Sequence, residues 1–460
     1  MIKKNDILEL YVDAMSDEGF GICRYTDAEL RDFVVYVPFV AVGERIEAVI
    51  VKKLSSYAFG KLEKVISPSP ARIEPDCRAF GKCGGCAYRH VSYAEELCYK
   101  KDSVVSAYRR AFGKDFFVDV ADTAASPENE FYRNKVQFPI DEKGKCAFYA
   151  NRSHRCVDIS DCKLQKKAFD PVVRAFERYV SENRISVYNE ETGKGLLRHL
   201  YLRYGEKHGE VFCCVVANGK KLPNEKELVR LLSEIPEVCG AVLCVNTKNT
   251  NVILGDEFRT LFGRPALRDS ICGVDVEISA KSFYQVNKKQ AEAIYEKACT
   301  LAAEADAEKV LDLYCGIGGI TFAASKSASE AVGVEIVPEA VEDAKRAAER
   351  CGIKNVRFYA SDANRLKSVL RSADFCPDTV IVDPPRKGLD GATVDALIEL
   401  LPERIVYISC NPDTQARNCR DIMEKAKAVG AEYSLGTVYP YDMFPRTAHV
   451  ESVVCLARSD

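Results

Sequence analysis

The sequence predicts a multidomain α/β protein. It is expected to have an oligonucleotide-binding-like β-barrel at the N-terminus, a central α+β domain and a doubly wound, Rossmann-like domain at the C-terminus. Short alternating apolar and polar runs fill the first 66 positions, and a linker with a cysteine cluster follows. After about residue 271, strand-like and helix-like stretches alternate regularly. A chain of 460 residues is long enough for about three domains.

Residues 1–66 are expected to form the barrel. Alternating runs at 7–12, 33–37 and 45–51 are separated by turns that contain Gly, Asp and Pro, as in small five-stranded barrels. The segment carries nine Lys/Arg against eleven Asp/Glu. A role in holding nucleic acid would therefore depend on the shape of the barrel rather than on its charge.

The central segment, 67–270, begins with a Ser-Pro linker and then a cysteine cluster, Cys77, Cys83 and Cys86, in a glycine-containing loop. The N-terminus lacks the apolar segment of a signal peptide and no apolar run is long enough to span a membrane, so a cytoplasmic location is expected. Disulfides are rare there, and three closely spaced thiols favour a metal centre with a fourth ligand further along the chain. The spacing is more typical of an iron–sulfur cluster than of zinc.

Most of the 20 cysteines are expected to be inert. Several lie in apolar, strand-like runs, where cysteine behaves as a small hydrophobic residue. These are Cys213, Cys214, Cys239, Cys244 and Cys455.

A helical period covers 89–113, and this helix is a candidate to pack with the C-terminal domain. Further along, residues 131–167 carry nine Lys/Arg against four Asp/Glu, with five aromatic residues interleaved. Basic and aromatic side chains together suit an RNA backbone and its stacked bases, although a solvated basic surface fits the pattern equally well. The net charge of −3 gives no independent support for nucleic-acid binding.

The C-terminal segment, 271–460, is predicted to hold a parallel sheet with its ligand at the carboxyl ends of the strands. Expected strands cover 310–314, 331–335, 356–359, 379–383 and 405–409, and expected helices cover 338–351 and 391–401. A glycine-rich turn follows the first strand. Acidic residues end four successive strands: Asp312, Glu335, Asp362 and Asp383.

Such a series of carboxylates suits a cationic, adenosine-containing ligand, and S-adenosylmethionine fits this description. NAD is the runner-up, but the turn lacks the third glycine of the dinucleotide fingerprint and an Asp-Pro-Pro element follows the fourth strand. One or two of these carboxylates could instead cap the helices that follow them.

Cys410 follows the apolar run 404–409 directly, in Ser409-Cys410-Asn411-Pro412. A cysteine at the carboxyl end of a buried strand lies where open α/β sheets bind their ligands, so Cys410 is a candidate nucleophile. Glu451 is a candidate general base that would act with it.

Six ordered motifs resemble those of the RNA uracil-C5 methyltransferases, specifically the bacterial 23S ribosomal RNA branch, over essentially the whole chain. They are the three-cysteine run, Phe283-Tyr284-Gln285-Val286-Asn287, the segment 312–318, Asp383-Pro384-Pro385-Arg386-Lys387-Gly388, Ser409-Cys410-Asn411-Pro412 and the segment 442–451.

The resemblance implies a TRAM barrel at 1–66 and a [4Fe–4S] cluster on Cys77, Cys83, Cys86 and Cys162, the fourth ligand being assigned by position. It further implies contacts to S-adenosylmethionine from Gln285, Tyr314, Glu335 and Asp383, with Cys410 as nucleophile and Glu451 as base. The cluster is expected to have a structural and RNA-positioning role, because methyl transfer requires no electron.

The function expected on this basis is methyl transfer to C5 of a uridine in a 23S ribosomal RNA loop, through a covalent Cys–C6 adduct, with the target uracil flipped out. No membrane and no obligate protein partner are expected. The alternative is a tRNA uracil-C5 methyltransferase. Two further possibilities are an amino-group nucleic-acid methyltransferase that uses Asp-Pro-Pro and an RNA chaperone with an inactive methyltransferase fold.

Overall fold

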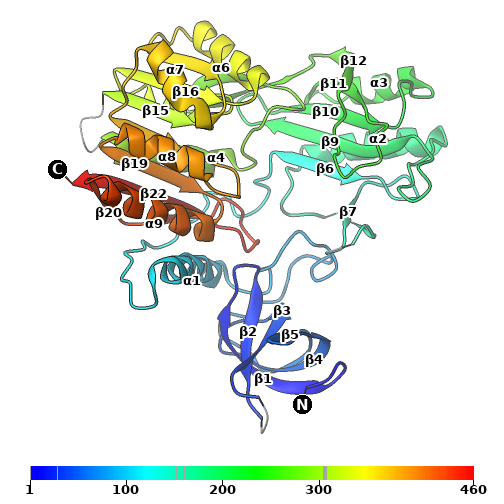
Figure 1. Cartoon of the computed structure of the whole chain (residues 1–460). Helices are drawn as coiled ribbons and strands as arrows, with labels where there is room; N and C mark the ends of the chain where they lie inside the picture. Colours follow the sequence, from blue (N-terminus) through cyan, green and yellow to red (C-terminus); the bar gives the residue numbers. More distant parts are fainter. Residues whose placement is uncertain (1, 28–29, 152, 159–160, 304–307, 460) are drawn as a thin grey trace. The chain divides into compact units, whose positions relative to one another are not determined.

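The computed structural model describes residues 2–27, 30–151, 153–158, 161–303 and 308–459. The chain forms two compact units. Figure 1 labels the helices and strands of both. The first comprises Met1–Ser126, Pro384–Leu401 and Tyr407–Asp460, and the second comprises Pro127–Asp383 and Pro402–Val406. These units combine parts of the three segments expected from the sequence, and the boundaries of those segments stay a prediction.

The N-terminal part of the first unit is a closed barrel with the strand order β1-β2-β3-β5-β4. Its strands are β1 (Ile7–Met15), β2 (Phe20–Tyr25), β3 (Phe33–Pro38), β4 (Arg45–Lys53) and β5 (Tyr57–Ser67). Buried residues alternate with partly or fully exposed ones along β3 and most of β4, and the inward residues form one apolar core. Gly21 is required where the chain crosses this core, because a Cβ there would lie 2.2 Å from Val40 Cγ2.

The rest of the first unit combines helices with an antiparallel sheet. β22 pairs antiparallel with both β20 and β21. The elements are α1 (Tyr93–Phe112), α8 (Gly391–Leu400), the end of β19 (Arg404–Ser409), α9 (Pro412–Ala428), β20 (Glu432–Leu435), β21 (Tyr439–Tyr441) and β22 (Glu451–Ser459).

Helix α1 packs against α9 within this unit. Tyr108 Oη donates a hydrogen bond to Gln415 Oε1 at 3.2 Å, and Arg110 Nη2 bonds Asp413 Oδ1 at 2.7 Å. Helix α1 is the helix expected within 89–113, and its partner α9 belongs to the C-terminal part of the chain.

A buried ionic cluster joins α1 to the segment before β22. Lys100 Nζ contacts the carboxylates of Glu96, at 2.8 Å, and Asp442, and all three side chains are buried. Tyr93 Oη donates a second hydrogen bond to Asp442, at 2.8 Å. Charges taken out of water need close partners, so Lys100 fixes this segment on the helix.

The second unit contains a mixed five-stranded sheet with the order β12-β11-β10-β9-β6. Helices α2 and α3 contribute apolar residues to the core on one face of it. The elements are β6 (Lys135–Pro139), the β7–β8 hairpin (Ala147–Tyr149, Cys156–Asp158), α2 (Phe169–Glu182), β9 (Leu197–Gly205), β10 (Glu210–Ala217), α3 (Glu225–Ser233), β11 (Val238–Val245), β12 (Glu257–Gly263) and the β13–β14 hairpin (Leu267–Ile271, Val274–Ile278).

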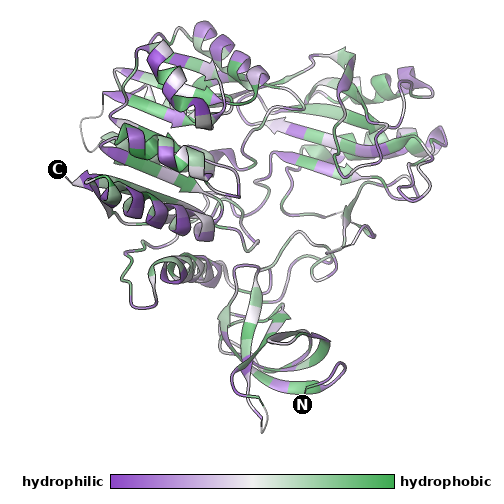
Figure 2. Cartoon of the chain, viewed as in Figure 1, coloured by the Kyte–Doolittle hydropathy of each residue, from purple (hydrophilic) through white to green (hydrophobic). Residues whose placement is uncertain are grey.

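The second unit also contains four parallel strands in the order β17-β16-β15-β18. The elements are α4 (Lys288–Ala303), β15 (Lys309–Leu313), α5 (Gly319–Ala324), β16 (Glu330–Glu335), α6 (Pro338–Arg350), β17 (Val356–Ala360), η1 (Ala363–Arg365), α7 (Leu366–Ala373) and β18 (Thr379–Val382). Figure 2 shows the outer surface of α6 as mainly hydrophilic, as expected for a helix that covers a sheet. The strand order reverses direction at β15, and such a switch point is where open α/β sheets bind ligands.

Among the described residues, no helix is both long enough and apolar enough to cross a membrane.

Replacing Lys100 by Met should leave two buried carboxylates without their ammonium partner. We expect the free energy of unfolding, measured by urea denaturation, to fall by about 3–5 kcal/mol. Lys101→Met is the matched control, since Lys101 pairs with the exposed Asp122, and it should cost less than about 1 kcal/mol. Equal losses in the two variants would show that the cluster does not stabilise the unit.

Candidate active site

The turn after β15 contains three residues with positive φ, an arrangement that lets a ligand approach the backbone. Tyr314 has φ 68° and Gly316 has φ 54°, and a Cβ built on Gly316 would meet no atom within 4 Å. Gly318, with φ 89°, packs so closely that a Cβ would lie 2.9 Å from the ring of Phe358. Glycine at 318 is thus required by packing, whereas glycine at 316 leaves open space in which a ligand can approach the backbone.

Glu335, at the end of β16, holds this turn in place through hydrogen bonds to the backbone. Its Oε2 accepts a hydrogen bond from Gly316 N at 3.0 Å, and its Oε1 accepts one from Val337 N at 3.0 Å. The side chain is half-buried. Each carboxylate oxygen keeps further acceptor capacity, which is the requirement for binding ribose hydroxyls.

The acidic residues at the four strand ends differ in accessibility. Glu335, Asp362 and Asp383 are partly exposed, but Asp312 is fully buried and accepts a hydrogen bond from Thr321 Oγ1 at 2.6 Å. The expectation that all four face a cationic ligand is therefore wrong for Asp312, which points into the core. Burial raises the pKa of Asp312 to about 8, so its side chain is mostly protonated at neutral pH.

Gln285 and Asp383 both lie near Tyr295, a buried side chain of α4. Burial and, next, the Asp383 carboxylate raise the pKa of Tyr295, and Gln285 forms a hydrogen bond with it. Burial also raises the pKa of Asp383, to about 7. The backbone around Gln285 is held by Asn134, whose Nδ2 donates to Gln285 O at 2.8 Å.

Cys410 occupies the junction between β19 and α9 in the first unit and is half-buried. Asn411 Oδ1 caps α9 by accepting from Asp413 N at 3.1 Å, and Pro412 occupies the first turn. Asn411 N also donates to Ser409 Oγ at 3.1 Å. The residues on both sides of Cys410 are therefore fixed by local hydrogen bonds.

Glu451 is the first residue of β22, where it pairs with Tyr441 and is 5% exposed. Gln415, buried in the first turns of α9, connects β22, which begins at Glu451, to β19, which ends just before Cys410. Gln415 Nε2 donates to Tyr407 O at 2.9 Å and to Ser452 O at 3.0 Å. Its Oε1 accepts from Ser452 Oγ at 2.6 Å.

Comparison with known proteins finds RNA methyltransferases that are similar along the whole chain. Residues 273–459 match the tRNA (Uracil-5-)-methyltransferase family. An uncharacterized RNA methyltransferase of Halalkalibacterium halodurans is 39% identical over 99% of this chain and 98% of its own length. One from Clostridium acetobutylicum is 37% identical over 100% and 98%, respectively.

The chain belongs to the RNA uracil-5-methyltransferase family.

A solved structure of the family is similar over nearly the full length of both chains. The Pyrococcus abyssi tRNA (uracil-54, C5)-methyltransferase, in complex with S-adenosyl-L-homocysteine, superimposes with a TM-score of 0.77 and 27% identity, over 98% of this chain and 99% of that one. The present uracil-5-methyltransferase is thus an S-adenosylmethionine-dependent RNA methyltransferase, and the predicted enzyme class is confirmed.

The expected cysteine ligands of this methyltransferase are divided between the units. Cys77, Cys83 and Cys86 lie in the first unit and Cys162 in the second. Within the described part of the chain, no group of three or more Cys, His, Asp or Glu is arranged to hold a metal ion. Ile159 and Ser160, next to the predicted fourth ligand, lie outside the described residues.

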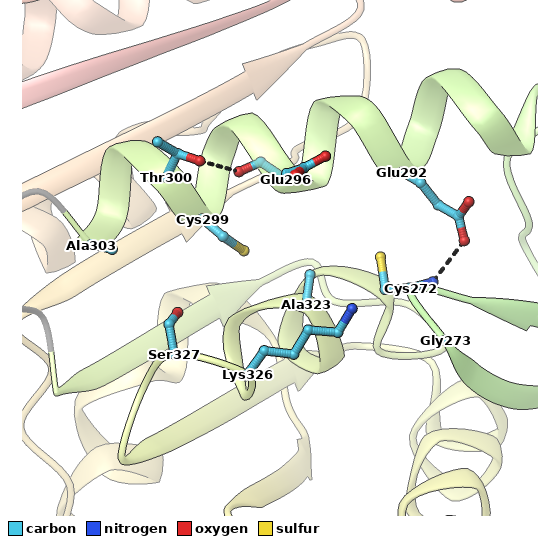
Figure 3. A pocket seen from close by; sticks show the side chains of 10 residues that line it. All are labelled: Cys272, Gly273, Glu292, Glu296, Cys299, Thr300, Ala303, Ala323, Lys326 and Ser327. Carbon is cyan, nitrogen blue, oxygen red and sulfur yellow. Dashed lines mark hydrogen bonds between the residues drawn. The ribbon is translucent and has the colours of Figure 1, made fainter. Parts of the chain in front are cut away.

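A pocket of about 770 Å³ in the second unit contains none of the predicted site residues (Figure 3). Cys272 and Cys299 line it, and Cys272 N donates to Glu292 Oε1 at 2.8 Å. Burial raises the pKa of Cys272 to about 11 and that of Cys299 to about 12. Both thiols are therefore protonated at neutral pH and are poor nucleophiles.

The sequence patterns do not predict the contacts of Gln415, Tyr295 and Asn134. Glutamine is usually exposed, so nothing in the first turn of a polar helix identifies Gln415 as buried. A signal for Asn134 does exist, since it lies in the basic, aromatic segment 131–167, but its contact with Gln285 joins residues 151 positions apart.

We expect the stability of the protein to decline between pH 5 and 9 in part because of Asp312. Its pKa is about 8 when folded and about 4 when unfolded, so the folded state keeps a proton that the unfolded state loses. The stabilisation is complete below about pH 4 and is lost as the pH rises through 8, with a slope of at most about 1.4 kcal/mol per pH unit.

Asp312→Asn is neutral throughout this range and can still accept the hydrogen bond from Thr321. Urea denaturation at pH 5, 7 and 9 should show the variant gaining stability relative to the natural protein as the pH rises. A difference that stays constant across the three pH values would contradict the raised pKa.

Proposed function

We propose that this enzyme methylates C5 of a uridine in a structured loop of 23S ribosomal RNA, through a covalent adduct of Cys410. The observation that carries the proposal is the placement of Cys410 between the buried strand β19 and the capped helix α9. Gln415 forms hydrogen bonds both to β19 and to β22, the strand that begins at Glu451. A nucleophile and a base on elements joined by one buried side chain suit a reaction in which both act on the same ring.

C5 of uracil is too weak a nucleophile to accept a methyl group unaided. The Cys410 thiolate adds to C6, and the electron pair of the C5–C6 double bond becomes an enolate with density on C5. The positive end of the α9 dipole, which begins two residues after Cys410, favours an anionic sulfur. After C5 has been methylated it carries both the methyl group and its original proton.

Glu451 then removes the proton from C5. The released electron pair restores the C5–C6 double bond, and the C6–sulfur bond breaks to return the Cys410 thiolate. A carboxylate is adequate for this step because the neighbouring carbonyl acidifies the proton. C6 and C5 must both be accessible, so the uracil has to leave its stack, which costs least in a loop.

S-adenosylmethionine, when bound, would supply an electrophilic methyl group to C5 and would leave as S-adenosylhomocysteine. Gln285, Tyr314, Glu335 and Asp383 are proposed to hold it. The fit is supported by the open space at Gly316, by the acceptor capacity of Glu335 and by the partly exposed Asp383. Glu335 would bind ribose hydroxyls, and the carboxylates would favour the cationic sulfonium.

Two substrate classes, ribosomal RNA and tRNA, are consistent with this chemistry. The N-terminal barrel, which we propose to be a TRAM domain, and the cysteine loop favour ribosomal RNA. A tRNA substrate is supported by the Pyrococcus abyssi enzyme, which is named for tRNA uracil 54 and aligns with 98% of this chain, so its alignment includes the barrel.

Incubation of the enzyme with 23S ribosomal RNA and with total tRNA, followed by mass-spectrometric mapping of 5-methyluridine, distinguishes these substrates. We expect methylation of a loop uridine in 23S ribosomal RNA. Methylation of tRNA alone would reject the ribosomal assignment and establish the alternative, while leaving the chemistry intact.

The adduct gives two further expectations for the same assay. Cys410→Ala should lower methyl transfer by about 10³-fold or more while RNA binding persists, and Glu451→Gln should accumulate a protein–RNA adduct on denaturing gels because elimination stalls. Cys376→Ala, at an exposed cysteine, is the control and should keep full activity.

RNA that contains 5-fluorouracil should trap the natural enzyme, since fluorine cannot be removed as a proton. Failure of both the fluorinated RNA and the Glu451→Gln variant to give an adduct would contradict the mechanism. It would favour amino-group methylation, which needs no cysteine.

A [4Fe–4S] cluster on Cys77, Cys83, Cys86 and Cys162 is part of the proposal. The loop shows one feature that fits such a centre, since Gly85 N donates a hydrogen bond to Cys83 Sγ at 3.4 Å. Backbone N–H groups directed at cysteine sulfur are common around iron–sulfur clusters and tune them. The cluster would fix the loop, and no step of methyl transfer passes through it.

Anaerobically purified protein should be brown and contain about four irons per chain. Cys77→Ser should lower the iron content, whereas Cys351→Ser, at an exposed cysteine elsewhere in the chain, should not. A colourless protein with bound zinc, or with no metal, would reject the cluster.

A further inference from the structure

Two basic residues stand directly opposite each other in the five-stranded sheet. Lys135 on β6 pairs with Arg203 on β9 in the antiparallel register, so their side chains lie on the same face. Like charges at directly opposed positions destabilise a sheet. The pair therefore has an unfavourable interaction that the sheet itself does not relieve.

Arg203 is buried without enough hydrogen-bond acceptors. It is 2% exposed, and its Nη2 donates to the backbone oxygen of Ser282. Its Nε and Nη1 are also buried, and no acceptor among the described residues meets hydrogen-bond geometry for either atom. The guanidinium lies 5.4 Å from the centre of the Tyr201 ring, and it interacts with that side chain both through a cation–π contact and through the phenol oxygen. Nε and Nη1 together carry three N–H groups, and the described part of the chain supplies fewer well-placed acceptors than that.

Lys135, on the neighbouring strand, is easier to reach than Arg203. It is half-buried, and no carboxylate among the described residues forms an ion pair with it. Burial and then the charges of Arg203 and Arg133 lower its pKa to about 8. An anion between the two strands would relieve both the repulsion and the missing hydrogen bonds, and could enter from the Lys135 side.

We propose that Lys135 and Arg203 form a binding site for an oxyanion. Resting on the proposed function, there are two sources for it: a phosphate of the RNA backbone, or the carboxylate of the methionine part of S-adenosylmethionine. The basic, aromatic segment 131–167 supports the first. The second is supported by the contact of Arg203 with Ser282, three residues before Gln285. The Nε and Nη1 atoms of an arginine suit the paired oxygens of either group.

Two binding measurements on the full-length protein distinguish these sources without any catalytic step. The first is the affinity for a uridine-rich 20-nucleotide RNA as a function of salt concentration. The second is the affinity for S-adenosylhomocysteine, compared with methylthioadenosine, which lacks the amino-acid carboxylate. The variants are Lys135→Met and Arg203→Lys, and Lys345→Met on the exposed side of α6 is the matched control.

If the anion is a phosphate, Lys135→Met should lower the slope of log affinity against log salt by about 0.7, the value for one contact to a single strand. The affinity for S-adenosylhomocysteine should then stay constant. If the anion is the carboxylate, the affinity for S-adenosylhomocysteine should fall about tenfold or more, with no change for methylthioadenosine and no change in the salt slope. The Lys345→Met control should match the natural protein in both assays.

A structural role predicts a different result. If Lys135 only supports the sheet, Lys135→Met should lower the urea midpoint and leave both affinities unchanged. An oxyanion site predicts that removing one of two opposed cations keeps or raises the midpoint of the ligand-free protein while one affinity falls. Unchanged affinities in both Lys135→Met and Arg203→Lys would overturn the proposal. The result is independent of the Cys410 chemistry, which the adduct assay tests separately.

Discussion

The hydrogen bonds of the Gln415 amide are the constraint on which the arrangement of the first unit depends. One side chain in the first turns of α9 bonds the backbone of β19, the backbone and hydroxyl of Ser452 in β22, and the phenol of Tyr108 in α1. A buried amide without these partners would be costly, so each element must keep its position relative to the others. The strand that ends before Cys410 and the strand that begins at Glu451 are thereby held together by a residue with no predicted role in catalysis.

Much of the local structure could be predicted from the sequence because it depends on short periodicities. The strand expected at 33–37 is Phe33–Pro38, and the helix expected at 338–351 is Pro338–Arg350. The alternating and helical patterns arise from one buried face in each element, which the sequence displays directly. The closed barrel of β1 to β5 follows from the same kind of pattern.

What could not be predicted depends on contacts between distant positions. Asp312 ends a strand like Glu335, yet its side chain bonds Thr321 inside the core, and the strand pattern does not distinguish the two orientations. From the sequence alone, Lys100 would be expected to lie on the exposed face of a helix. In the structure it is buried and forms an ion pair with Asp442, 342 residues further along the chain. The same limit applies to the division of the chain, since the first unit is built from three separated segments.

This discontinuity has a consequence for synthesis of the protein. The carboxylate of Asp442 that binds Lys100 is translated 342 residues after it. At a translation rate of roughly 5–20 residues per second, about 20–70 seconds pass between the synthesis of Lys100 and that of Asp442. During this interval the apolar and charged groups of α1 that later contact α9 and β21 face solvent or a chaperone. The N-terminal barrel, whose strands are all local, can close early, whereas the part of the same unit that carries Cys410 and Glu451 can form only after β22 has left the ribosome.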